Sequence, residues 1–200
     1  MNTQPLILGI GGTTRAGSST EKALLVSLRA AEAMGARTAM MAGPELELPL
    51  YAPERPERTD AARKLVDLFR RADGYIFSSP SYHGSISGLI KNALDYTEDL
   101  REDERPYLDG RAVGLIAGAA GWQGPGQTLA AMRAIVHALR GWPTPLGAML
   151  NTELKVFGED GGCIDASAEF QLQTVGRQVV QFALAQRALA GGSLQRRTGT

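Results

Sequence analysis

The chain contains five short apolar runs that carry no charge. Runs that are apolar throughout, rather than at alternate positions, predict strands buried on both faces of a sheet. Segments between and after these runs have apolar residues at helical spacing. The expected strands are Leu6–Ile10, Thr38–Ala42, Gly74–Ser78, Ala112–Ala117 and Leu146–Leu150, and the helical segments are centred on residues 24–31, 65–72, 86–93, 129–139 and 172–182.

Because strand and helix alternate five times, the pattern predicts an α/β fold with a doubly wound sheet of five parallel strands and helices on both faces. In a 2-1-3-4-5 order the first and third strands are neighbours where the strand order reverses, and ligands bind beyond the carboxyl ends of strands at that point. The loops after strands one, three and four are therefore candidate binding loops. We expect one domain over residues 1–190 and a disordered tail at residues 191–200.

Composition excludes several classes of protein. With 21 acidic and 21 basic residues, the chain lacks the overall positive charge that holds nucleic acid or an anionic membrane. It also lacks a signal peptide and the roughly 18-residue apolar stretch of a membrane helix. The single Cys163 has no CxxC partner and no His/Cys cluster nearby. We expect a cytoplasmic protein with no membrane, nucleic-acid or metal partner.

The first candidate loop has the spacing G-x-x-x-x-G-S-S from Gly12 to Ser19. It is close to the triphosphate loop, but Ser18 stands at the lysine position, and a dinucleotide fingerprint is incomplete because Thr14 replaces its third glycine. Backbone N–H groups at a helix start, hydroxyls and one arginine suit a single phosphate. Helix capping by Ser18 or Ser19 is the alternative, but it accounts for only one hydroxyl. The candidate anion ligands are Thr13, Thr14, Arg15, Ser18, Ser19 and Thr20.

The other two candidate loops are suited to a flat ligand. After the third strand, Pro80 is expected to redirect the chain, Tyr82 and His83 offer planar groups, and Gly84 allows close approach of the backbone. After the fourth strand, residues 118–127 carry four glycines and are expected to form an open turn. Taken singly, surface or oligomer contacts for Tyr82 and His83 and an ordinary glycine-rich loop are alternatives.

Taken in order, GTTRAGSST, SPSYHGSISGLIKNALDY and GAAGWQGPG resemble the NADPH-dependent FMN reductase family of flavodoxin-like proteins, as does LPLYAPE at Leu48–Glu54. The similarity extends over about residues 6 to 185. It implies a flavodoxin-like fold that binds FMN and uses NADPH or NADH. It further implies that the first loop holds the FMN phosphate through Thr13, Arg15, Ser18, Ser19 and Thr20. The isoalloxazine ring is then bordered by Pro80, Ser81, Tyr82, His83, Gly84 and Ser85 on one side and by Gly118, Ala119, Ala120 and Gly121 on the other.

The chain departs from the family in its ring loops. The family often has T-P-E-Y where this chain has Ser79 to Tyr82, and a Gly-Gly pair where this chain has Ala119 to Trp122. These departures do not affect the residues expected to bind the phosphate. They change residues expected to shape the ring pocket, and so they bear on which electron acceptor the protein uses. Hydride transfer to the flavin needs no side-chain acid or base, so we name no catalytic residue. Tyr82 or His83 is a candidate for protonating a quinone-type acceptor.

The leading hypothesis is an NAD(P)H-dependent FMN reductase that supplies reduced flavin to a monooxygenase, because GTTRAGSSTEKAL resembles that branch of the family. An NAD(P)H:quinone or azo reductase acting on bound FMN is the alternative. A non-enzymatic electron carrier of the flavodoxin kind is disfavoured by the zero net charge, and a hydrolase by the lack of a G-x-S-x-G elbow. The resemblance also implies a homodimer or homotetramer, with residues 43–60 and 85–97 as expected contact surfaces.

Overall fold

One sheet, built in the strand order β2-β1-β3-β5-β6, runs through the computed structural model, which describes residues 4–197 and side chains as far as residue 190. Neighbours along this path are parallel. A short strand, β4, pairs antiparallel with the end of β3 and was not predicted. The strands are β1 (Leu6–Gly11), β2 (Arg37–Ala42), β3 (Gly74–Tyr82), β4 (Ser85–Ile86), β5 (Ala112–Ala119) and β6 (Trp142–Asn151). The predicted parallel strands and their order 2-1-3-4-5 are confirmed, with β5 and β6 as the fourth and fifth.

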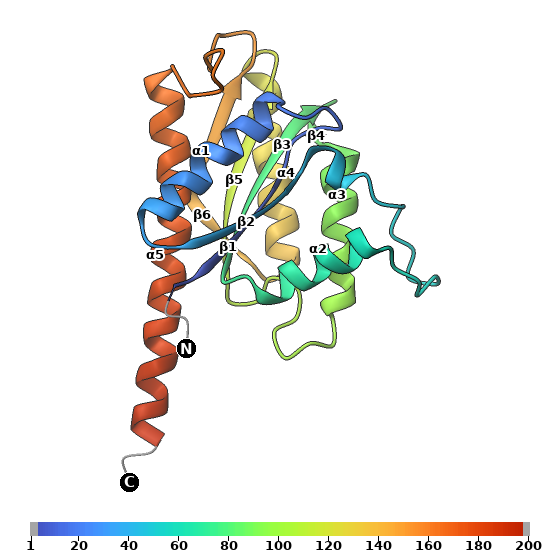
Figure 1. Cartoon of the computed structure of the whole chain (residues 1–200), viewed down its shortest axis with the longest axis vertical. Coiled ribbons are helices and arrows are strands. Elements are labelled where there is room, and N and C mark those ends of the chain that lie inside the picture. The colour runs from blue at the N-terminus through green and yellow to red at the C-terminus, as the bar shows by residue number, and fades with distance from the viewer. Residues whose placement is uncertain (1–3, 198–200) are drawn as a thin grey trace.

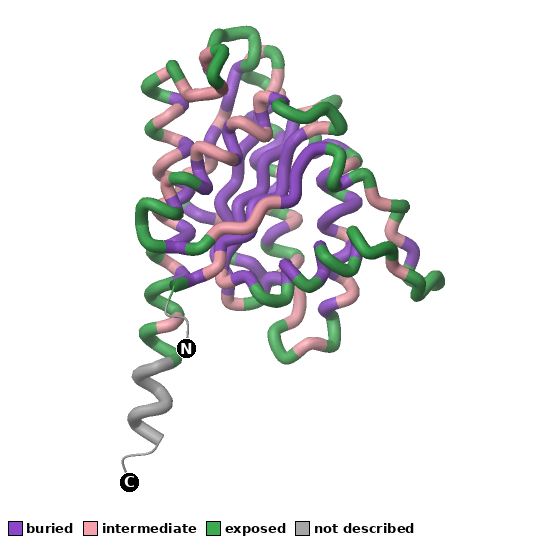
Figure 2. The backbone as a smooth tube through the Cα atoms, in the orientation of Figure 1, coloured by how far each residue is buried: buried purple, intermediate pink, exposed green. Residues whose placement is uncertain are grey.

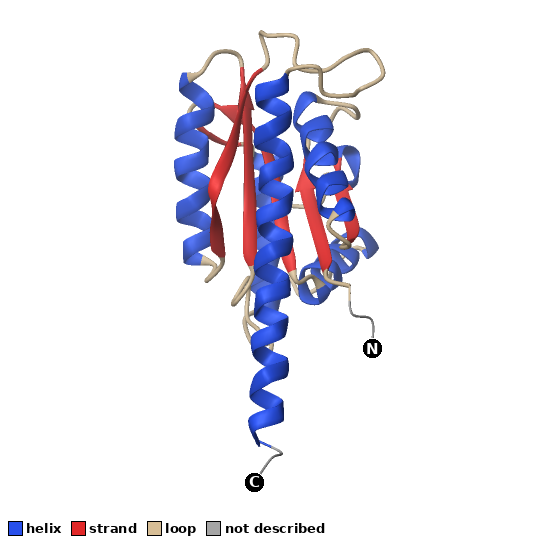
Figure 3. Ribbon diagram, turned by 90° about the vertical axis from the view of Figure 1, so that its left-hand side faces the viewer, coloured by secondary structure: helices blue, strands red, loops and turns tan. Residues whose placement is uncertain are grey.

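Helices cover both faces of the sheet (Figure 1, Figure 3). One face carries α1 (Ser19–Ala33) and α5 (Ala166–Arg197), and the other carries α2 (Asp60–Arg71), α3 (Gly88–Asp95) and α4 (Gln123–Ala138). Two short 3₁₀ helices are η1 (Gly43–Leu46) and η2 (Tyr96–Leu100). The tail predicted at residues 191–200 falls outside the part of the chain whose side chains are described. Within residues 4–197, none of the helices combines the length and apolarity needed to cross a membrane.

Two apolar layers enclose the sheet, and Figure 2 shows its strands as the buried centre of the molecule. Leu8, Phe77 and Leu115 pack with α2, α3 and α4. Their neighbours in the chain, including Ile7 and Ile76, pack with α1 and α5 on the opposite face. Because successive strand residues point to opposite faces and both faces are covered, the runs are apolar throughout rather than alternating.

The contact between α1 and α5 fixes the position of α1. The Ser27 hydroxyl of α1 donates a 2.7 Å hydrogen bond to the carbonyl of Leu172 in α5. Gly176, one helical turn further along α5, lies against the Ser27 carbonyl, where a Cβ would stand only 3.1 Å from the carbonyl carbon. The two helices can pack this closely because residue 176 has no side chain. The start of α1, and the loop before it, are therefore held at a defined place on the sheet edge.

The proline-rich segment 43–59, which we call the arm, follows β2. Residues 43–60 were expected from the sequence to be a contact surface; in the structure this segment begins with η1 and then packs on α3 and η2. The Asn92 amide of α3 donates to the carbonyls of Leu48 and Pro49 and accepts from the Tyr51 N–H, at 2.9–3.3 Å. Arg58 makes two hydrogen bonds of 2.8 and 2.9 Å to Asp99. The arm is irregular in backbone yet firmly anchored.

Replacing Asp99 with asparagine should loosen the far end of the arm. Hydrogen bonds from Arg58 hold the pKa of the Asp99 carboxyl below its ordinary value. Because the folded-state pKa is the lower one, the pair stabilises the protein at neutral pH, and that contribution is lost as the pH falls below about 4. We expect Asp99→Asn to lower the free energy of unfolding by about 1 kcal/mol at pH 7 and by less at pH 3. Urea unfolding at both pH values tests this, and an equal loss at both would contradict the assignment.

Candidate functional site

The loops after β1, β3 and β5 meet at one edge of the sheet, at the carboxyl ends of the strands (Figure 1). Strand register places Gly11 opposite Ser78, and Pro80 opposite Gly118. The Gly12 N–H also donates to the Ser78 carbonyl at 3.3 Å. The structure therefore brings together the segments that contain all the predicted ligand-binding residues. Their place agrees with the rule that open α/β sheets bind ligands at this edge.

Part of the first loop serves its own folding. The Ser18 hydroxyl caps α1 by accepting a 3.3 Å hydrogen bond from the Glu21 N–H, and Ser18 and Thr20 are buried. The Thr13 hydroxyl forms a local turn with the backbone of Arg15, at 3.2–3.3 Å. The capping alternative is thus correct for Ser18, and these hydroxyls are not free in the way the sequence suggested.

Other groups of the first loop have no partner within the described residues 4–197. The Arg15 side chain is exposed and forms no ion pair there. The backbone N–H groups of Ser19 and Thr20, in the first turn of α1, donate to none of the described residues, and the Thr14 hydroxyl has no partner there either. A cation beside unpaired N–H groups at a helix start is the donor set that a phosphate group requires. The first loop fits one phosphate.

Glu21 shapes this loop and was missed from the sequence. Its carboxylate accepts a 2.8 Å hydrogen bond from the N–H of Gly17, a residue with φ of +70°. Ser18 and Glu21 have the S-x-x-E spacing of a capping box, which would have identified the pair. Here the carboxylate reaches one residue further back than in the usual box, and it fixes the turn that presents Arg15.

The third loop is a β-hairpin, which corrects the expectation that Pro80 redirects the chain. Strand β3 continues through Pro80 to Tyr82, turns at His83 and Gly84 and returns as β4. The φ angles of +52° and +83° at the two turn residues are those of a type I′ hairpin. Pro80 pairs with Gly118 of β5, but its missing N–H would face the β1 side, as the Ser78 carbonyl does, and β1 has already ended there.

Side chains from α4 hold this hairpin. The Thr128 hydroxyl donates a 2.7 Å hydrogen bond to the Ser81 hydroxyl. Gly84 lies against Gln127, whose side-chain oxygen would be 2.8 Å from a Cβ at residue 84. Tyr82 is 53% exposed at the hairpin tip, and His83 is also exposed. The hairpin therefore has a fixed base and presents two exposed rings.

The fourth loop is shorter than predicted. Gly118 and Ala119 are the last residues of β5 rather than part of an open turn, and α4 begins at Gln123. Gly118 is buried, with the Thr20 methyl 3.3 Å from where its Cβ would be. The turn proper, which includes Ala120 and Gly121, lies beside Trp122, whose side chain is 57% exposed.

Asn151, at the end of β6, fixes the fourth loop and was also missed from the sequence. Its side-chain oxygen accepts hydrogen bonds from the Gly121 N–H at 2.9 Å and the Glu153 N–H at 3.0 Å. The residue is buried. The signal in the sequence was a polar side chain that directly follows the apolar run Leu146–Leu150.

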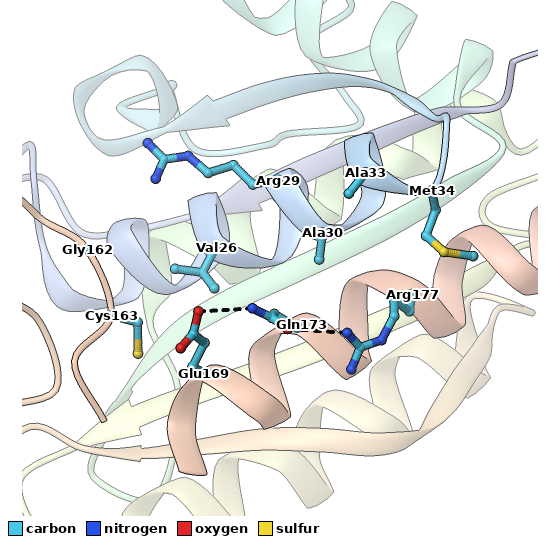
Figure 4. Close-up of a pocket in the computed structure, with 10 residues that line it drawn as sticks. All are labelled: Val26, Arg29, Ala30, Ala33, Met34, Gly162, Cys163, Glu169, Gln173 and Arg177. Carbon is cyan, nitrogen blue, oxygen red and sulfur yellow. Dashed lines mark hydrogen bonds between the residues drawn. The ribbon is translucent and has the colours of Figure 1, made fainter. Parts of the chain in front are cut away.

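A cavity of about 450 Å³ lies elsewhere, between α1 and α5 (Figure 4). A hydrogen-bonded row on α5 follows its edge: Gln173 donates to Glu169 at 3.0 Å, and Arg177 donates to Gln173 at 3.2 Å. None of the residues lining this cavity belongs to the three loops. Among residues 4–197, no three His, Cys, Asp or Glu side chains are grouped so that they could hold a metal ion.

Comparison with known proteins bears on what these loops bind. Residues 5–153 match the family described as NADPH-dependent FMN reductase. The NADPH azoreductase of Bacillus sp. (strain OY1-2) is 38% identical over 89 residues, covering 44% of this chain and 47% of that protein. The FMN-dependent NADPH-azoreductase of Staphylococcus aureus is 32% identical over 129 residues, covering 64% and 65%. The chain thus spans about half to two thirds of the length of these relatives.

Solved structures share the fold. FerB, a flavoenzyme NAD(P)H:(acceptor) oxidoreductase from Paracoccus denitrificans, superposes with a TM-score of 0.75 at 18% identity, covering 91% of this chain and 98% of FerB. A flavodoxin, WrbA-like protein from Agrobacterium tumefaciens gives a TM-score of 0.64 at 15% identity, covering 92% and 99%. These similarities show a flavodoxin-like fold, as expected from the sequence.

Proposed function

Because the chain belongs to the NADPH-dependent FMN reductase family, we propose that it catalyses hydride transfer from NADPH or NADH to FMN. The observation that supports this most directly is the first loop, where the exposed Arg15 and the N–H groups of Ser19 and Thr20 have no partner within residues 4–197. FMN carries one phosphate, and this loop offers the donors for one phosphate.

Each of the three loops would bind a different part of FMN. Arg15 and the start of α1 would hold the phosphate, with the hydroxyls of Thr14 and Ser19 available to it. The hydroxyls of Thr13, Ser18 and Thr20 already form hydrogen bonds within the loop. The β3–β4 hairpin, residues 80–85, lies along one side of the ring, and the small residues 118–121 leave room at the other. When bound, FMN supplies the hydride acceptor. Hydride transfer needs no side-chain acid or base, and Tyr82 or His83 at the exposed hairpin tip protonates the final acceptor.

Two activities are distinguished by the molecule that finally accepts the electrons. The matched relatives carry the names of azoreductases, which favours FMN that stays bound and reduces an azo or quinone-type compound. In the other form, reduced FMN leaves and supplies a flavin-dependent monooxygenase. The protein acts in the cytoplasm in either form.

A purified sample distinguishes these forms through its visible spectrum after desalting and through NADPH and NADH oxidation with added FMN or an azo dye. Retained yellow FMN and dye reduction support the bound form, whereas saturable turnover of free FMN supports flavin supply. Bound FMN without NADPH or NADH oxidation in the presence of FMN or any acceptor indicates an electron carrier. A colourless protein that neither binds FMN nor oxidises NADPH or NADH would overturn the proposal.

We also propose that the chain forms a homodimer or homotetramer through the arm and residues 85–97. Leu50 supports this because it is 80% exposed in the arm, beside the stretch that Asn92 anchors. Burial against a second copy would remove its apolar surface from water. We expect Leu50→Asp to shift the sedimenting species towards the monomer with unchanged circular dichroism. An unchanged mass would argue against this contact.

A further inference from the structure

A small cavity of about 150 Å³ lies next to the first loop. Ser19 and Lys22, in the first turn of α1, form one of its sides. The other side comes from the end of β6 and the segment that follows it. The remaining lining residues are Leu150, Thr152, Leu154, Lys155, Val156 and Phe157.

The cavity contains an unusual share of the chain's lysines. The sequence has four lysines, and all of them lie within the described residues. Lys64 pairs with Glu45 at 3.5 Å, and Lys91 pairs with Asp95 at 2.6 Å. The other two, Lys22 and Lys155, form no ion pair with any residue between 4 and 197, and both line this cavity. The two lysines without an ion pair in the described part of the chain therefore border the same cavity.

Two carboxylates lie near the cavity, and both are hydrogen-bonded to backbone N–H groups rather than to the lysines. The Glu21 carboxylate bonds the Gly17 N–H, and the Asp160 carboxylate, in the turn beside Lys22, bonds the Gly162 N–H. Both carboxylates keep their negative charge, but neither pairs with Lys22 or Lys155, so the two ammonium groups remain able to bind an added anion.

The identity of the anion is inferred from the number of phosphate groups on the two substrates, FMN and the nicotinamide dinucleotide. The single phosphate of FMN is assigned to Arg15 and the first loop, so a second anion site beside it serves the other substrate. We infer that Lys22 and Lys155 bind a phosphate group of the nicotinamide dinucleotide, an inference that rests on the proposed function. The cavity shares Leu150, Leu154 and Val156 with a second one, of about 120 Å³, that extends to Trp122. The two adjoining cavities offer the ribose and base of the dinucleotide a surface between the lysines and Trp122 that includes these three apolar side chains.

The test compares two double variants that remove the same charge. Lys22→Gln/Lys155→Gln should raise the KM for NADPH about tenfold without changing kcat or the FMN dissociation constant. Lys64→Gln/Lys91→Gln, which removes two lysines elsewhere, should leave KM unchanged. If KM for NADH stays constant, the lysines bind the 2′-phosphate; if it rises equally, they bind the pyrophosphate, and both results support the inference. Equal KM values in the two double variants, or weaker FMN binding instead, would overturn it.

A binding measurement separates this inference from the proposed function. Calorimetric titration with NADP⁺ should show about tenfold weaker binding to Lys22→Gln/Lys155→Gln, with a difference that shrinks as salt is added. If the unsubstituted protein oxidises NADPH but the variant binds NADP⁺ equally well, only the lysine assignment fails. If the unsubstituted protein does not oxidise NADPH yet binds NADP⁺ through these lysines, only the reductase proposal fails.

Discussion

Replacing Arg15 with glutamate is expected to weaken FMN binding about a hundredfold, or about 2.7 kcal/mol. Arg15 is the only charged residue between Gly12 and Thr20, and its exposed side chain has no ion pair within the described residues. The substitution removes a charge-assisted contact to the phosphate and adds repulsion. Because the turn is held by Glu21 and Ser18, its shape should not change. Quenching of FMN fluorescence on binding measures the dissociation constant.

Two controls make this result specific to the phosphate. Riboflavin has the same ring without the phosphate, so Arg15→Glu should leave its affinity unchanged. Arg29→Glu changes the charge of an exposed arginine on α1, outside the first loop, and should leave FMN binding close to normal. If Arg15→Glu weakens FMN and riboflavin equally, or Arg29→Glu weakens FMN as strongly, Arg15 is not the phosphate ligand.

The strands and the position of the binding loops were predictable for one physical reason. A parallel sheet covered on both faces requires continuous apolar strands, and the runs from Leu6–Ile10 to Leu146–Leu150 supply them. The topology then places the carboxyl ends of adjacent strands at one edge. Residues as far apart in the chain as Gly11, Ser78 and Gly118 could therefore be placed near one another before any coordinates were known.

The hairpin after β3 was not predictable, because its form depends on where another strand stops. Pro80 has no N–H and, judged alone, ends a strand. It lies inside β3 because β1 ends at Gly11, opposite Ser78, and leaves no pairing partner on that side of β3 beyond this point, although β5 still pairs on the other side. That boundary is a property of the sheet and cannot be read from residues 78–85.

The side chains that hold the loops were missed for a related reason. Asn151 bonds a residue 30 positions away, and Thr128 bonds one 47 positions away. The arm likewise depends on Asn92 and Asp99, more than 40 positions from Tyr51 and Arg58. Its four prolines give no sign of this anchoring. The position of Asn151 directly after an apolar run marked it in the sequence, but no local spacing pattern shows which distant loop such a side chain supports, so only the folded arrangement identifies its partner.

Gly176→Ala is expected to lower the free energy of unfolding by about 2–3 kcal/mol, because the added methyl group overpacks a close helix contact. Its Cβ would overlap the carbonyl oxygen of Ser27 and lie 3.2 Å from the Ala30 methyl. The oxygen belongs to the backbone of α1 and cannot rotate away as a side chain would. For a chain of this length the loss corresponds to a melting temperature lower by about 4–12 °C, measurable by thermal unfolding.

Gly126→Ala is the matched control, because it places the same methyl group in another helix. The added Cβ in α4 would meet only the Met149 sulfur, at 3.9 Å, so stability should stay equal or rise by up to about 1 kcal/mol. Since α1 carries the first loop, an α1 displaced by Gly176→Ala should also bind FMN more weakly than the control, even well below the melting temperature. Equal stability in the two variants would show that α1 and α5 can separate without cost and that their contact does not position the phosphate site.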